Sequence, residues 1–157
     1  MFIAAEPFGM FAGLPLHPLL VHSAVVLVPL VAIGALVMSY LPSFSRRHGK
    51  LILILALVAQ VSVFLAKMSG EAFSEILNKE VEKHAELGEI TPFVTIPMVA
   101  LIYLRWRMDR AGSSIGSVLI RRLTSVALVI ASLASLVVIF FVGHSGASSV
   151  WGWIDKL

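Results

Sequence analysis

Four long apolar runs constrain the fold of this chain more than any other feature of its sequence. They occupy residues 19–41, 51–69, 85–106 and 122–142, and few charged residues interrupt them. A helix rises about 1.5 Å per residue, so about 20 apolar residues cross the hydrocarbon core of a bilayer. A helix also satisfies its own backbone polar groups where no water is present. The runs therefore predict an all-α integral membrane protein with four transmembrane helices in an up-down bundle.

The third run is the least regular of the four. Its continuous apolar part, residues 91–104, is short for a membrane span. It reaches full length only if the helix begins near His84, which places Pro92 and Pro97 inside it. We therefore expect one helix over the segment HAELGEITPFVTIPMVALIYL.

Composition agrees with a membrane location and excludes several kinds of site. The chain is 59% hydrophobic and 13% charged, whereas soluble domains average about 45–50% and about 25%. It has no cysteine, which excludes disulfides, iron–sulfur clusters, thiolate metal sites and a covalently attached c-type heme. The net charge of +3 does not indicate nucleic-acid binding, because the basic residues lie in short loops between apolar runs.

One polar segment separates the second and third runs. Residues 71–83, EAFSEILNKEVEK, carry apolar side chains near helical spacing with Glu and Lys between them. We interpret them as a short amphipathic surface helix or as an extension of the second span. No internal repeat or second domain is visible, so residues 1–157 are treated as a single domain.

The basic residues predict the orientation in the membrane. Eight of the 12 Lys and Arg residues follow the first and third spans: Arg46, Arg47, Lys50, Arg105, Arg107, Arg110, Arg121 and Arg122. The positive-inside rule places these loops in the cytoplasm and both termini on the non-cytoplasmic side of the cell membrane. Residues 1–18 contain no Lys or Arg, so we expect no cleavable signal peptide.

Four of the five histidines lie near the same ends of the predicted helices. His17 and His22 open the first span, His84 opens the third and His144 closes the fourth, whereas His48 lies in the inner basic loop. With the orientation above, the four form one layer at the outer leaflet.

The chemistry of this layer favours a cofactor site. Neutral imidazole is a common ligand for transition metals and heme iron. Heme b would need two axial imidazoles and a slot for its macrocycle, which small neighbouring residues provide: Ser69, Gly70, Gly88, Gly143, Ser145 and Gly146. We prefer His22 paired with His84 or His144, because Pro18 biases His17 away from helical geometry.

Two other interpretations of the histidines stay open. A divalent metal held by three histidines with Glu86 or Glu71 uses the same residues. Alternatively, the histidines bond backbone groups at helix ends or meet water at the headgroups.

The second span carries a polar stripe. Gln60 lies near mid-membrane, and Lys67 and Glu71 follow on the same helical face. The stripe suggests a proton or ion path toward the histidine layer. We favour the simpler interpretation, in which Gln60 bonds a neighbouring helix and Lys67 reaches the headgroups.

Small residues also recur along the fourth span. Ala127, Ala131 and Ser135 lie at four-residue spacing, which lets helices approach closely. This spacing indicates packing within the bundle or at a homodimer contact.

The segments GLPLHPLLVHSAVVLVPLVAIGAL, EKHAELGE and GHSGASSVWG resemble a known bacterial family. They are similar to the membrane proteins grouped as domain of unknown function 2231, and the resemblance covers essentially the whole chain. The opening motif HP-x-x-x-H at His17 to His22, followed by a long span of Val, Leu and Ala, is fairly specific. The resemblance implies a four-helix membrane domain, and it carries over His17, His22 and His84 best. It implies no activity.

Three functions follow from these features. The first is a small heme-binding or redox-linked membrane protein. The second is a non-catalytic accessory or assembly subunit of a larger membrane complex, since little of the chain lies outside the membrane. The third, metal or proton transport, ranks last because no inverted repeat is visible. No nucleophile–base pair, phosphate loop or intramembrane carboxylate pair indicates an enzyme.

Overall fold

Four long helices make up nearly all of the computed structural model, which describes residues 10–77, 82–112 and 118–154. They are α1 (Leu16–Tyr40), α2 (Pro42–Leu77), α3 (Glu82–Ala111) and α4 (Val118–Trp151). Each is long and apolar enough to cross a membrane. Strands β1 (Met10–Phe11) and β2 (Leu14–Pro15) form a small antiparallel hairpin before α1.

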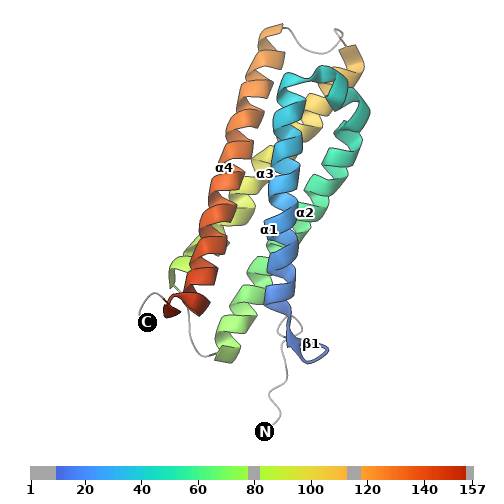
Figure 1. Ribbon diagram of the computed structural model, residues 1–157. Helices are drawn as coiled ribbons and strands as arrows, with labels where there is room; N and C mark the ends of the chain where they lie inside the picture. The colour runs from blue at the N-terminus through green and yellow to red at the C-terminus, as the bar shows by residue number, and fades with distance from the viewer. Residues whose placement is uncertain (1–9, 78–81, 113–117, 155–157) are drawn as a thin grey trace.

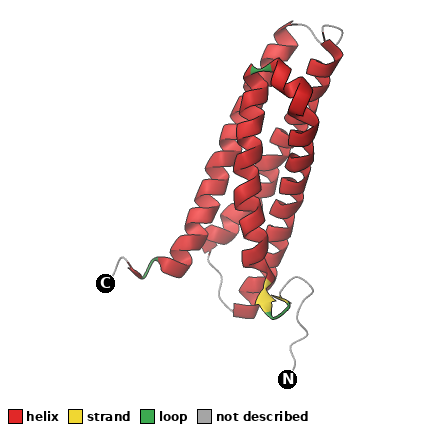
Figure 2. Cartoon of the chain, turned by 45° about the vertical axis from the view of Figure 1, so that its right-hand side comes forward, coloured by secondary structure: helices red, strands yellow, loops and turns green. Residues whose placement is uncertain are grey.

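The helices run alternately up and down as one bundle (Figure 1). Helix α1 packs against α2 and α4, and α3 packs against the same two helices, so α1 and α3 are diagonally opposite. We call the end where α1 begins and α4 ends the terminal end; α2 also ends there and α3 begins there (Figures 1 and 2). The other end, where Leu41 joins α1 to α2, is the arginine end.

The interior of the bundle is built from small and medium side chains. Fully buried positions include Val31, Ala35, Met38, Ile102 and Leu128, each with 0% of its surface exposed. Large apolar side chains also cover the outside of every helix: Val26, Ile33, Val61, Phe93, Ile130 and Phe140 are among them. An outer surface this apolar is stable only in lipid.

The described helices extend beyond the predicted spans. Helix α3 begins at Glu82, which confirms that one helix starts near His84 and passes through both prolines. Helix α2 has 36 residues, a length of about 54 Å, and so exceeds a hydrocarbon core of about 30 Å.

The predicted short surface helix over 71–83 is not present as a separate element in the described chain. Residues 71–77 continue α2, and 82–83 already belong to α3. Residues 78–81 lie outside the described part. The sequence EAFSEIL contains no proline or glycine, so nothing in it ends α2 where the apolar run stops.

Small residues set the closest helix contacts. Ser135 is fully buried and Ala131 is 9% exposed, so most of the small-residue stripe of α4 packs inside the bundle. A Cβ atom at Gly49 would lie 2.4 Å from Cδ1 of Trp106, so α2 meets the ring on α3 without room for a methyl group.

Candidate functional site

Two histidines from diagonally opposite helices meet at the terminal end. His17 is the second residue of α1 and His84 the third residue of α3. Their ring centroids are 6.0 Å apart with an interplanar angle of 75°. Both side chains are partly buried, and Phe73 of α2 stacks on His17 with a centroid distance of 6.1 Å. We call His17 and His84 the histidine pair.

Each imidazole of the histidine pair is held by the helix that follows it. His17 Nδ1–H donates to the Ala66 carbonyl at 3.0 Å and to the Ser69 hydroxyl oxygen at 3.3 Å. His84 Nδ1–H donates to the Val142 carbonyl at 3.0 Å, and its Nδ1 lies 3.1 Å from the Ser145 hydroxyl.

These bonds fix the tautomer of both rings. A carbonyl oxygen only accepts, so Nδ1 must carry the proton in each imidazole. The Nε2 atom of each neutral ring therefore keeps its lone pair. A backbone carbonyl behind Nδ1 is the usual support of a metal-ligating histidine, because it orients the ring and raises the basicity of Nε2.

Two glycines make room for the rings. A Cβ atom at Gly70 would lie 3.0 Å from Cε1 of His17, and one at Gly146 would lie 3.0 Å from Cε1 of His84. With Ser69 and Ser145, these residues seat the imidazoles against α2 and α4. They do not form the macrocycle slot that their size alone suggested. Gly88 and Gly143 differ, because a Cβ atom there would meet nothing within 4 Å.

The structure pairs His17, and not His22, with His84. Helix α1 begins at Leu16, one residue before His17, because Pro18 needs no amide donor in the first turn. The bias of Pro18 against helical geometry at His17 is overcome there. His22 is exposed, and its Nδ1–H donates to the Pro18 carbonyl of its own helix.

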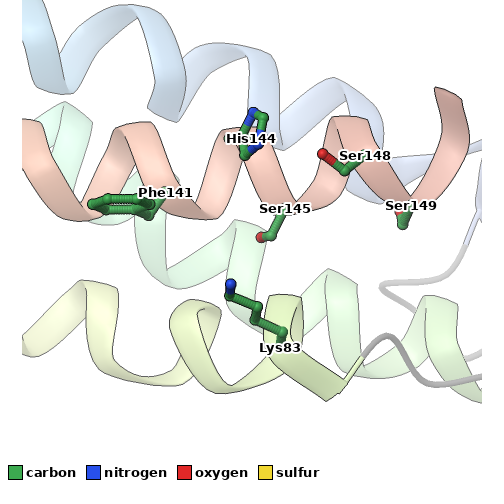
Figure 3. Close-up of a pocket in the computed structure, with 6 residues that line it drawn as sticks. All are labelled: Lys83, Phe141, His144, Ser145, Ser148 and Ser149. Carbon is green, nitrogen blue, oxygen red and sulfur yellow. The ribbon is translucent and has the colours of Figure 1, made fainter. Parts of the chain in front are cut away.

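His144 lies on the outside of the bundle. It is exposed and stacks on Phe140 with a centroid distance of 6.0 Å and an interplanar angle of 3°. It lines a shallow surface hollow together with Lys83, Phe141, Ser145, Ser148 and Ser149 (Figure 3). Ser145 connects this hollow to the histidine pair, because its hydroxyl also meets His84.

The acidic side chains that the structure describes near this end do not complete a larger metal site. Glu71 forms an ion pair with Lys67 along α2, and Glu86 is exposed on α3. Within residues 10–77, 82–112 and 118–154, no group of three or more His, Cys, Asp or Glu side chains lies close enough to hold a metal ion. The geometry thus offers two imidazole donors, without the third histidine and carboxylate of the divalent-metal hypothesis.

The mid-membrane amide joins two helices. Gln60 Nε2–H donates to the Pro92 carbonyl at 3.2 Å, and Thr95 Oγ1–H donates to Gln60 Oε1 at 2.8 Å. The expected bond from Gln60 to a neighbouring helix is confirmed, and the neighbour is α3. Both ends of the amide are occupied, which favours a structural role for Gln60.

Sequence reasoning missed a buried ion cluster at the arginine end. The Asp109 side chain has 0% exposure and accepts bonds of 2.6 Å from both Arg105 Nε and Arg121 Nη2. Arg105 also donates to Ser125, and Arg121 donates to the Met108 carbonyl at 2.9 Å. The sequence does contain a signal for this cluster, because an acidic residue, Asp109, lies four residues after Arg105 in an otherwise basic segment. Two of the arginines assigned to topology therefore also fasten α3 to α4.

Comparisons with known proteins address the family but not the site. No curated protein and no solved structure matches the chain. A family model described as "Predicted membrane protein (DUF2231)" matches residues 13–153. This range includes all four helices and both members of the histidine pair. The chain therefore belongs to this family of membrane proteins.

Proposed function

We propose that this multi-pass membrane protein binds heme b at the terminal end of its bundle, where His17 and His84 would hold its iron. One observation carries the proposal: two imidazoles are each fastened through Nδ1–H, their Nε2 lone pairs are left for a ligand, and their centroids are 6.0 Å apart.

The residues present fit the ligation of this group in three respects, although Gly70 and Gly146 are filled by the imidazole rings and form no slot for its macrocycle. The donors come from facing helices, as a bundle cofactor requires. Their hydrogen-bond partners are those of ligating histidines. Lys83 and the hydroxyls of Ser148 and Ser149 line the hollow beside Ser145, and they would suit the heme carboxylates. When bound, the heme would supply one-electron redox chemistry, whereas the chain itself binds and orients it.

An absorption spectrum of the full chain tests the proposal. Protein expressed with a heme precursor and purified in detergent should show a Soret band. His17→Ala and His84→Ala should each remove most of it, whereas His22→Ala and His144→Ala should leave it. Added imidazole should restore part of the band in the first two variants, which separates loss of a ligand from misfolding.

Three results would overturn this assignment. They are a wild-type protein without a Soret band, a band insensitive to both His17→Ala and His84→Ala, or a band lost equally in all four variants. A stoichiometric transition metal found by elemental analysis without heme would replace heme by a two-imidazole metal site.

A second candidate, a non-catalytic accessory subunit, is favoured by the small amount of described chain outside the helices. Besides the hairpin, only Leu41, Gly112 and the residues after Trp151 lie outside them. In that case, the histidine pair would act as a clamp between helices. Co-purification of a stoichiometric membrane partner under mild solubilisation would support it, and a heme-free monomer would count against it.

The orientation forms part of the proposal. All arginines of the chain lie at or near the arginine end, and the positive-inside rule makes that end cytoplasmic. The chain has no cysteine, so single cysteines report its topology. An impermeant maleimide should label Ser149→Cys in intact cells, and Ser43→Cys only after permeabilisation. The reverse labelling would place the histidine pair at the cytoplasmic face.

A further inference from the structure

The two halves of the chain hold their histidines in the same way. His17 contacts a carbonyl, a serine and a glycine at positions 66, 69 and 70 of α2, and His84 contacts the same three groups at positions 142, 145 and 146 of α4. Each serine hydroxyl also donates to that same carbonyl, at 3.0 Å in α2 and 2.9 Å in α4. One arrangement of three groups therefore occurs twice.

The correspondence continues along the second helix of each half. Gly146 follows Gly70 by 76 residues. The same shift relates five further buried positions of α2 to buried positions of α4: Ile52 to Leu128, Ala56 to Ser132, Ala59 to Ser135, Ser62 to Val138, and Val63 to Ile139. The buried faces of α2 and α4 thus have one register, counted from the Ser-Gly pair.

The first helices of the two halves correspond as well. His84 follows His17 by 67 residues. That shift relates buried positions of α1 to buried positions of α3: Ala24 to Thr91, Val28 to Thr95, Val31 to Met98, Ala35 to Ile102, and Met38 to Arg105. Because both histidines face the bundle, the 3.6-residue period of a helix places buried residues at these same distances, so this match follows from the shared orientation of His17 and His84.

The two shifts differ by nine residues because the halves are joined differently. Only Leu41 separates α1 from α2, whereas α3 is longer than α1 and residues 112–117 follow it before α4. We infer that the chain is a tandem repeat of a two-helix unit. The units supply equivalent halves of one clamp, with the histidine pair astride a pseudo-two-fold axis along the bundle.

For the identity of the ligand, this inference rests on the proposed heme binding. It adds that the two halves of the chain would hold the ligand in equivalent ways. His17 and His84 would both be donors to the iron of a bound heme. A site that holds the iron through two such imidazoles would suit the transfer of single electrons and not the binding of a gas or a substrate.

An experiment on the heme-free chain tests the equivalence alone. In protein with ¹⁵N-labelled histidine, the rings of His17 and His84 should both show the Nδ1-protonated tautomer. Ser69→Ala should shift only the signals of His17, and Ser145→Ala should shift those of His84 to a similar extent. A different tautomer in the two rings, or a response to one serine only, would overturn the repeat as the basis of the site.

Carbon monoxide added to the reduced, heme-loaded chain tests the coordination. We expect no shift of the Soret band in the wild type, and carbon monoxide binding of similar extent in the residual heme of His17→Ala and His84→Ala. Carbon monoxide binding by the wild type, or by only one variant, would overturn the symmetric clamp. Absence of any Soret band together with equivalent ¹⁵N signals would reject heme binding and leave the repeat standing.

Discussion

Removing the Asp109 carboxylate should destabilise the protein far more than removing an exposed carboxylate with the same spacing to its partner. Asp109 is four residues after Arg105, as Glu71 is four after Lys67. The Asp109 and Arg105 side chains are 0% and 6% exposed, whereas those of Glu71 and Lys67 are 57% and 27% exposed. Asp109→Ala leaves the buried Arg105 charge without its carboxylate counterion, which costs about 3–5 kcal/mol. Glu71→Ala should cost less than about 1 kcal/mol.

The assay is the free energy of unfolding in mixed detergent micelles, measured for both variants. The double variant Arg105→Met with Asp109→Leu should recover most of the loss, since it removes both charges and keeps the volume. Arg121, whose side chain is 25% exposed, can then extend to water. Equal losses for Asp109→Ala and Glu71→Ala, or no recovery in the double variant, would refute this account of the cluster.

Three further substitutions, with a fourth as their control, test the helix contacts. Gln60→Leu should lower the free energy of unfolding by about 0.5–2 kcal/mol through two lost bonds to α3, and heme content should not change. Gly49→Ala should cost about 1–3 kcal/mol, because its Cβ would lie 2.4 Å from Trp106. Gly70→Ala should weaken heme binding about 10–100-fold, because the added methyl group would displace the His17 ring that would hold the heme. Gly88→Ala, with nothing within 4 Å, should leave both stability and heme binding unharmed, and a comparable loss there would contradict these assignments.

The fold could be predicted because lipid imposes a simple rule on the sequence. Each apolar run had to be a helix, and loops as short as Leu41 had to make the helices antiparallel. The ends were less predictable, since an apolar run records the thickness of the bilayer and not where the backbone stops being helical. Residues 71–77 show this, because they are polar enough to leave the membrane and still helical.

The gathering of histidines at one end could also be predicted, but the pair could not. The position of a residue along a transmembrane helix fixes its depth in the bilayer, and the apolar runs of the sequence give that depth directly. Which side of the helix faces the bundle depends on rotation about its axis. His17 and His22 differ by five residues, about 140° around a helix, so only one of them can face inward. Proline statistics favoured His22, and packing against Gly70 selects His17.

The signal that would have identified the pair was the recurrence of Ser-Gly near the end of the second helix of each half. Taken alone, each Ser-Gly is ordinary, since small residues are common wherever membrane helices pack. It becomes informative only when each is matched with one histidine of the preceding helix. The halves share few identical residues and differ by nine in spacing, so a direct comparison of their sequences shows no repeat. What the halves share is the placing of one imidazole against one carbonyl, hydroxyl and glycine. That arrangement requires particular groups at only four positions in each half. The other corresponding positions need only be buried, and no particular residue type is required there.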